Sequence, residues 1–299
     1  VIIVVCAVEG IMPQTETVIR QALKEKVKPV LFINKVDRLI AELQVTPEDM
    51  MQRFGKIITE VNKLIVRMVP EEFKKEWMVD AQAGTVAFGS AYHNWATSLP
   101  FMAKKNVNFK QIYEFMEKEQ RRELAQAAPL HEVLLDMIVE KLPSADAAQK
   151  YRIPHIWRGE SEEDIGQAMV NANADGDSAF MVTKVVLDPH AGEIAVGRLF
   201  SGTIKKGDQM YVAGMPNANR VQSVGMFVGG DRIATENVTA GNIIAVSGLR
   251  DAQSGSTISS NKDMTPFERI VHNSDPVVTT AIEAKHTKDL PKLCLLYTS

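Results

Sequence analysis

Asn34, Lys35 and Asp37 stand where an apolar run, residues 29–33, gives way to polar side chains. The run is rich in β-branched and aromatic residues, so it predicts a strand buried on both faces. In open α/β sheets, ligands bind at the carboxyl ends of strands, because the loops converge there. The Asp37 carboxylate can accept parallel hydrogen bonds from N1 and the 2-amino group of guanine, whereas adenine offers neither donor. Asn34 can reach the base edge, and the alkyl stem of Lys35 can lie over the base plane. These residue types therefore predict a guanine site.

A second short strand is predicted over residues 85–89, and Ser90 and Ala91 fall at its end. An Asn after a strand can be only a turn former, so the first motif carries limited weight alone. Two polar elements at two strand ends are harder to obtain by chance. Because such ends meet at one edge of a parallel sheet, the sequence predicts that both elements belong to one site.

Several motifs resemble those of a known family. Asn34-Lys35-Val36-Asp37 resembles the guanine-specificity motif of GTP-binding proteins, and the Arg38 that follows resembles translation factors. Ser90-Ala91 resembles the second guanine loop, whose backbone N–H groups donate to the base oxygen. Gly-x-x-Pro-Gln-Thr at residues 10–15 resembles translational GTPases, and Gln-Lys-Tyr-Arg-Ile-Pro at 149–154 resembles the elongation factor 2 family in its archaeal form. The likeness covers nearly the whole chain up to Leu293.

The resemblance implies a GTP-binding and GTP-hydrolysing factor that promotes translocation of tRNA and mRNA on the ribosome. The implied cofactors are GTP and, in the full-length protein, Mg²⁺. The implied partners are the ribosome directly and the tRNA–mRNA complex indirectly. The resemblance also implies that the protein is a monomer and that it works in the cytoplasm. The implied GTP-binding residues are Asn34, Lys35, Asp37, Ser90 and Ala91.

The chain starts at Val1 inside an apolar run and contains no Gly-x-x-x-x-Gly-Lys-Ser/Thr phosphate loop. Phosphoryl transfer needs a phosphate cradle, a magnesium ligand and a positioned water. We therefore expect a fragment that lacks these elements: no catalytic residue and no metal ligand is assigned, and the fragment alone is predicted to be inactive. Two alternatives stay open at this point, a ribosome-binding module without catalysis and another translational GTPase, such as a tRNA-delivering or ribosome-rescue factor.

The elements that position the site can be read from the hydrophobic period. Residues 1–7 and 29–33 are predicted strands joined by a helix through about residue 26, which is a βαβ unit with a parallel pair. Thr46-Pro47 is typical of a helix start, and apolar spacing predicts one long amphipathic helix from there to Ile65. Further helices are expected over 71–80, 109–126 and 130–142. The basic residues Lys104, Lys105, Arg121 and Arg122 are interpreted as solvated helix faces.

From Ala179 onward, apolar residues recur at every second position, in short predicted strands that are separated by Gly-rich turns. This pattern is typical of a β-barrel. Strands are predicted at 180–188, 193–201, 209–212, 220–227 and 242–247. We interpret the barrel as a ribosome-docking module. Lys205-Lys206 is a candidate phosphate contact there, although turn lysines explain the pair equally well.

The predicted fold class is an α/β parallel sheet like that of P-loop GTPases, truncated at its N-terminal side, followed by an all-β barrel and the start of an α+β third domain. The predicted domains are a partial GTP-binding domain over 1–158 with an inserted helical subdomain at about 39–84, a linker over 159–174, the barrel over 175–260, and a connector with the third domain's start over 261–299. A strand is expected at 276–284, and nothing accounts for the tail Cys294–Ser299.

Composition excludes several classes of protein. The 299 residues are 45% hydrophobic with a net charge of −3, so bulk charge does not indicate a nucleic-acid binder. Two cysteines are too few for a disulfide framework, and no apolar run is long enough to span a bilayer. The six histidines are scattered, and no metal site is proposed.

Overall fold

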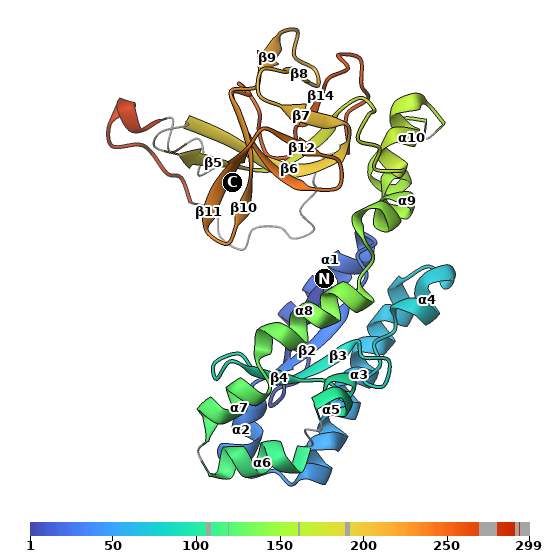
Figure 1. The fold of residues 1–299 in the computed structure, drawn as a ribbon, viewed down its shortest axis with the longest axis vertical. Helices are drawn as coiled ribbons and strands as arrows, with labels where there is room; N and C mark the ends of the chain where they lie inside the picture. Colours follow the sequence, from blue (N-terminus) through green and yellow to red (C-terminus); the bar gives the residue numbers. More distant parts are fainter. Residues whose placement is uncertain are drawn as a thin grey trace. The chain divides into compact units, whose positions relative to one another are not determined.

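A computed structural model describes residues 1–105, 109–118, 120–160, 162–188, 192–268, 280–290 and 293. The chain divides into two compact units, Val1–Pro143 and Ser144–Ser299. The first is drawn from blue to green and the second from yellow-green to red (Figure 1). In the described residues, no helix combines the length and apolarity that crossing a membrane requires.

A four-stranded sheet forms the centre of the first unit, in the order β1 (Ile2–Cys6), β2 (Val30–Asn34), β3 (Val86–Ser90), β4 (Trp95–Thr97). The first three strands are parallel, and β4 turns back antiparallel to β3. The prediction of a parallel βαβ unit is thus confirmed. The carboxyl ends of β2 and β3 lie side by side, since Ile33 is the register partner of Phe88.

Helices cover both faces of this sheet, which explains why β2 is almost entirely apolar. Val30 and Phe32 pack with Val133 and Met137 of α8 (Leu130–Lys141) on one face. On the other face, Phe54 of α3 (Pro47–Met68) stacks on Phe88 of β3 with ring centroids 4.7 Å apart. The long helix within the predicted insertion at 39–84 therefore packs directly on the sheet.

The remaining helices of the first unit are α1 (Pro13–Lys24), α2 (Val36–Ala41), α4 (Glu71–Trp77), α5 (Leu99–Lys105), α6 (Phe109–Glu117) and α7 (Arg121–Ala127). Thr46 caps α3 as predicted, since its hydroxyl accepts from the Asp49 N–H. The expectation of one helix over 109–126 was wrong. Gln120 leaves the helical region at φ −82° and ψ 53°, and the segment forms α6 and α7 instead. The sequence analysis also missed α2, α5 and β4.

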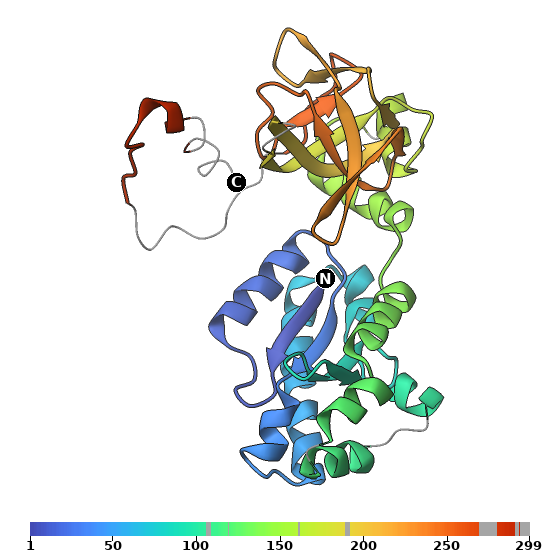
Figure 2. The same cartoon turned by 60° about the vertical axis from the view of Figure 1, so that its left-hand side comes forward.

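The second unit contains an eight-stranded sheet that curls around one core (Figure 2). Its order is β11 (Asp231–Thr235), β10 (Ser223–Val228), β13 (Ile243–Ser247), β6 (Gly192–Ser201), β5 (Ala179–Asp188), β14 (Thr257–Ser259), β8 (Gln209–Val212), β9 (Ala218–Arg220). A short pair, β7 (Thr203–Lys205) with β12 (Asn237–Thr239), adds Ile204 and Val238 to that core. The all-β prediction holds, although five short strands, β7, β9, β11, β12 and β14, were not foreseen.

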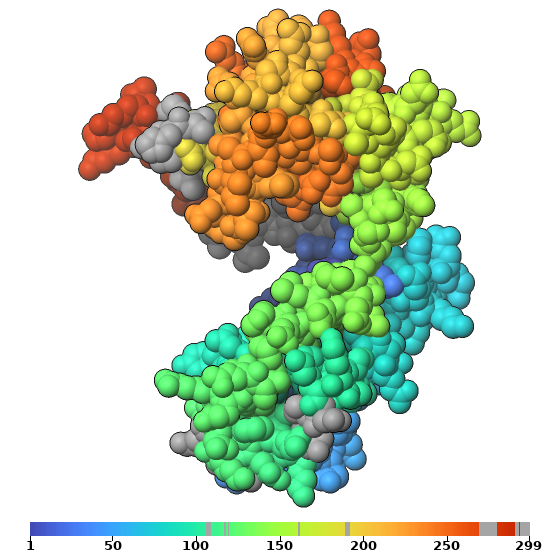
Figure 3. Space-filling view, in the orientation of Figure 1, coloured from blue at the N-terminus to red at the C-terminus, as the bar shows by residue number. Residues whose placement is uncertain are grey.

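Two helices, α9 (Ala145–Ile156) and α10 (Asp164–Val170), belong to the second unit. Together with Trp157 and Met264, their apolar side chains pack on Phe200 of β6. Buried Gln149 donates from its side-chain amide to the carbonyl oxygens of Met169 and Phe200. The yellow-green atoms of both helices lie along one side of this unit (Figure 3). The predicted boundary at residue 158 and the linker at 159–174 stay predictions; the compact units divide before α9.

The C-terminal part holds a 3₁₀ turn, η1 (Thr287–Asp289). Residues 280–284, the described end of the strand expected at 276–284, form no strand. The rest of that expected strand and the tail Cys294–Ser299 lie outside the described residues.

Candidate guanine-binding site

The candidate site forms where β2 and β3 end next to each other. Asn34 closes β2 and Ser90 closes β3. Because the two strands are parallel neighbours, both loops leave from the same edge. The chain topology alone therefore brings two segments that are far apart in sequence into one place.

Asn34 links the two loops through its side-chain oxygen. Its Oδ1 accepts from the backbone N–H of Lys35 at 2.8 Å and from that of Ala91 at 2.9 Å. Lys35 adopts a left-handed conformation with φ +64°, which is uncommon for a residue other than glycine. The hydrogen bond to the Lys35 N–H helps to hold that turn, from which α2 begins at Val36.

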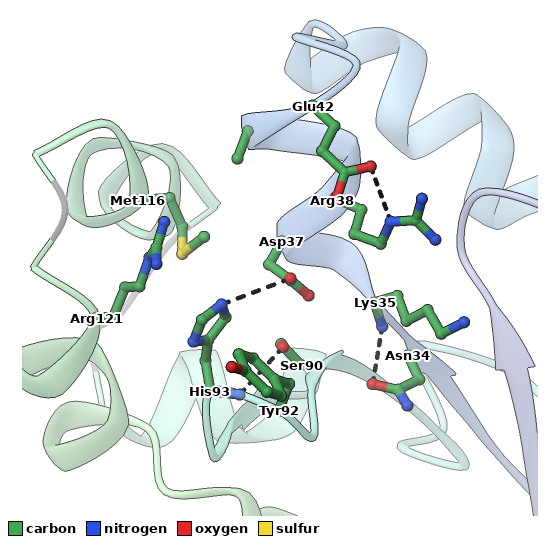
Figure 4. Close-up of a pocket in the computed structure, with 11 residues that line it drawn as sticks. Asn34, Lys35, Asp37, Arg38, Glu42, Ser90, Tyr92, His93, Met116 and Arg121 are labelled. Carbon is green, nitrogen blue, oxygen red and sulfur yellow. Dashed lines mark hydrogen bonds and ion pairs between the residues drawn. The ribbon is translucent and has the colours of Figure 1, made fainter.

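Asp37 lies in the first turn of α2, and its side chain is 16% exposed. The carboxylate atom Oδ1 is buried and has no hydrogen-bond partner in the described structure. The other oxygen, Oδ2, lies 3.6 Å from Nε2 of His93 (Figure 4). A buried carboxylate oxygen without a donor is costly, so this atom is available for a ligand N–H.

Ser90 and His93 hold the second loop in shape. Ser90 is 1% exposed, and its Oγ accepts from the His93 N–H at 3.3 Å. This short turn brings the His93 ring toward Asp37 (Figure 4). Ala91 is exposed, and its N–H is the group bonded to Asn34.

These loops line a cavity of about 570 Å³. Its lining residues are Asn34, Lys35, Asp37, Arg38, Ala41, Glu42, Ser90, Tyr92, His93, Met116 and Arg121. Met116 and Arg121 approach from the helical segment opposite α2, and the Lys35 side chain extends on the side of Asp37 away from His93 (Figure 4). The cavity volume falls within the range of ordinary small-molecule sites.

Two charged residues that line the cavity, Arg38 and Glu42, pair with each other. Arg38 donates from Nε to Oε2 of Glu42 at 2.9 Å, and this hydrogen bond raises the pKa of Arg38. In the described residues, no group of three or more His, Cys, Asp or Glu side chains is arranged to hold a metal ion.

The structure brings the five predicted residues together. Asn34, Lys35, Asp37 and Ser90 line the cavity, and Ala91 is bonded to the first of them. Sequence reasoning missed the other seven lining residues, which are Arg38, Ala41, Glu42, Tyr92, His93, Met116 and Arg121. The position of Tyr92 and His93 directly after Ser90-Ala91 was a usable signal. Arg121 was interpreted as part of a solvated face, and nothing local to it indicates the cavity.

Both parts of the chain are similar to known proteins. Residues 1–144 match the elongation factor Tu GTP-binding domain, and residues 192–259 match elongation factor Tu domain 2. Elongation factor 2 from Picrophilus torridus is 59% identical over 292 residues, covering 98% of this chain and 40% of the relative. Elongation factor 2 from Methanocaldococcus jannaschii is 56% identical over 293 residues, with 98% of this chain and 40% of the relative covered.

The elongation factor 2 of Methanosarcina thermophila is 57% identical over 292 residues, again with 98% of this chain covered. The chain spans about 40% of the length of these curated relatives. The two matched domains follow in the same order as the α/β unit and the β-sheet unit of the structure. The chain therefore belongs to the elongation factor 2 family.

Proposed function

We propose that this chain reads the guanine base of GTP at the cavity between β2 and β3. Asp37 accepts from guanine N1 and the 2-amino group, Asn34 holds the two loops together and reaches the base edge, and the Ser90–Ala91 turn faces the base oxygen. The alkyl stem of Lys35 covers the base plane after a change of side-chain rotamer. Adenine would leave the carboxylate without its donors, and sites of this kind reject such analogues strongly.

The observation that carries the proposal is the buried Asp37 Oδ1 without a partner, in the same cavity as Ser90. A carboxylate held between two linked loops, with one oxygen engaged near His93 and the other open, matches the two adjacent donors of guanine. The guanine base of GTP fits this cavity. The residues that would cradle its phosphates are not identified in this sequence.

The remainder of the proposal concerns the whole factor. We infer that the full-length protein hydrolyses GTP, with Mg²⁺ held by residues outside this chain, and works as a monomer in the cytoplasm to promote translocation of tRNA and mRNA on the ribosome. Mg²⁺ would neutralise charge on the phosphates. The second unit supplies a ribosome-docking surface, and this chain alone does not turn over GTP.

The base-reading proposal is tested by NMR titration of the 299-residue chain with guanosine, inosine and adenosine. Inosine keeps the N1 donor and lacks the 2-amino group, so the expected affinity order is guanosine, then inosine, then adenosine. Resonances of Asn34, Ala91 and His93 are expected to shift. Equal affinity for guanosine and adenosine, or shifts confined to other residues, would refute the site.

A separate measurement addresses hydrolysis. Radiolabelled GTP incubated with this chain is expected to release no phosphate above the protein-free rate. Release that is abolished by Asp37→Asn would show that the chain carries its own catalytic elements, contrary to the proposal.

A further inference from the structure

The two oxygens of the Asp37 carboxylate have different surroundings. Oδ2 lies 3.6 Å from Nε2 of His93, whereas Oδ1 is buried without a hydrogen-bond partner. Both side chains are 16% exposed, and both residues line the same cavity. Among the described residues, no lysine or arginine nitrogen lies within 4.0 Å of this carboxylate. His93 is therefore placed to act on one oxygen of Asp37 while the other oxygen stays open.

The two basic neighbours of Asp37 in the chain are directed elsewhere. Arg38 donates from Nε to Glu42, so its guanidinium is engaged along α2. The Lys35 side chain extends on the side of Asp37 away from His93 (Figure 4). The polar partner of this carboxylate thus comes from the turn after β3, not from its own helix.

Contacts within the turn after β3 fix the position of the His93 ring. The His93 N–H donates to Ser90 Oγ at 3.3 Å, and the Asn94 N–H donates to the Ala91 carbonyl oxygen at 3.3 Å. Asn94 closes the turn in the left-handed region with φ +56°, which asparagine tolerates better than most residues. The Tyr92 ring packs edge-on against the imidazole, with ring centroids 4.9 Å apart. The imidazole is therefore held in place by its own turn, before any ligand binds.

An aspartate carboxylate needs a restraint of this kind to present both oxygens to a planar base. Rotation about its last side-chain bond is broad and roughly twofold, so that bond does not by itself fix the plane of the group. The two parallel N–H groups of guanine bind both oxygens when the carboxylate lies close to the plane of the base. Fixing that plane in advance lowers the entropy that binding costs. A donor on one oxygen supplies the restraint, and the oxygen keeps a second lone pair for the ligand.

We propose that His93 is a positioning residue for guanine recognition: its Nε2–H donates to Oδ2 of Asp37 and keeps Oδ1 directed at the base. The distance of 3.6 Å is longer than a hydrogen bond, and contacts of this kind often tighten when a ligand binds. Nε2 therefore carries a proton in the complex. This inference rests on the proposed reading of guanine by Asp37, and it adds the group that orients the carboxylate.

The first experiment compares His93→Phe with His93→Gln in the nucleoside titration. Phenylalanine keeps a ring against Tyr92 and removes the donor, whereas the glutamine amide offers a donor close to the position of Nε2. His93→Phe is expected to weaken guanosine binding about 2- to 10-fold, which corresponds to the loss of one hydrogen bond. His93→Gln is expected to stay within about twofold of the parent chain. Adenosine offers the carboxylate neither donor, so its affinity is expected to be the same in all three proteins.

His131→Phe is the matched control, because this histidine is exposed on α8 of the same unit and is not among the residues that line the cavity. It is expected to bind every nucleoside like the parent chain. Equal guanosine affinity in His93→Phe and the parent would overturn this inference alone. A loss of equal size for guanosine and adenosine would also overturn it, since that loss reports damage to the turn. A parent chain without a preference for guanosine would overturn the proposed function, and this inference with it.

A second measurement needs no substitution, so it does not depend on whether either variant folds. Long-range proton–nitrogen NMR spectra of the chain with guanosine show which ring nitrogen of His93 carries a proton. A protonated Nε2 is expected in the complex. An unprotonated Nε2 would overturn the inference, because Oδ2 of Asp37 would then face a lone pair instead of a donor.

Discussion

The side-chain oxygen of Asn34 accepts a hydrogen bond of 2.9 Å from the backbone N–H of Ala91, 57 positions later in the chain. One amide group thus joins the loop after β2 to the loop after β3, and it also bonds the Lys35 N–H. Together with the pairing of β2 and β3, this link holds the loop that carries Asp37 next to the turn at Ser90. The link is therefore a property of the site that can be tested without any ligand.

Replacing Asn34 with Ala is expected to free the Ala91 amide. Loss of one hydrogen bond of this kind costs about 1 kcal/mol, so hydrogen exchange at Ala91 is expected to accelerate roughly five- to tenfold. Asn34→Asp is the matched control, because it retains an acceptor oxygen at the same position, and it is expected to preserve the protection. Identical exchange in all three proteins would mean that the link does not restrain the loop.

Asp37→Asn is expected to reverse base preference. The amide keeps one acceptor but replaces the other carboxylate oxygen with a donor, which opposes the 2-amino group of guanosine and suits the 2-oxo group of xanthosine. A hydrogen bond to a charged group contributes about 1.5–3 kcal/mol, so guanosine affinity is expected to fall about 10- to 150-fold. The measurement is the NMR titration with both nucleosides. A variant that still prefers guanosine would place the base elsewhere.

The end of β2 could be predicted because the strand is an uninterrupted apolar run and the sequence changes abruptly to polar residues after it. The start of α2 was missed, since Lys35 enters it through a left-handed conformation without a side-chain cap. β4 was missed because it is only 3 residues long, and so short a strand cannot show an alternation of apolar and polar residues. Arg121 lines the cavity because the helical segment is interrupted at Gln120 and α7 begins at Arg121. Tertiary packing of this kind leaves no local pattern in the sequence.

Asp146 gives the second unit a predictable pH dependence. The Ser144 hydroxyl donates to this carboxylate and lowers its pKa below the ordinary value of 3.8. A carboxyl group whose pKa is lower in the folded state stabilises the fold above its unfolded pKa, and this contribution disappears as the pH falls through the folded value. Asp146→Asn is therefore expected to lower the thermal midpoint of the second unit at pH 7 and to leave it unchanged near pH 2.

Asp164, in the first turn of α10, provides the comparison for that prediction. Its variant Asp164→Asn tests whether any acidic residue in a first turn has the same effect through the helix dipole. A larger loss at pH 7 for Asp146→Asn than for Asp164→Asn is expected, since the Ser144 hydroxyl lowers the pKa of Asp146. A loss that is the same at pH 2 as at pH 7 would contradict the assignment.

Two glycines of the first unit are expected to respond to alanine with opposite signs. A Cβ at Gly89 would lie 2.3 Å from the Trp95 carbonyl oxygen, because β3 and β4 approach closely just before Ser90. Neither of these backbones can give way without disturbing the turn that carries Ser90. Gly55 lies exposed in the interior of α3, and a Cβ there meets nothing within 4 Å.

Gly89→Ala is expected to lower the free energy of unfolding of the first unit by about 1–3 kcal/mol, as overpacked sites do, and to weaken guanosine binding with it. Gly55→Ala is expected to raise that free energy by about 0.5–1 kcal/mol through helix propensity, with base binding unchanged. Urea unfolding followed by tryptophan fluorescence and the nucleoside titration measure the two effects separately. If Gly89→Ala unfolds like the parent chain and binds guanosine equally well, the close approach of β3 and β4 does not position the site, and the base must be read without the Ser90 turn.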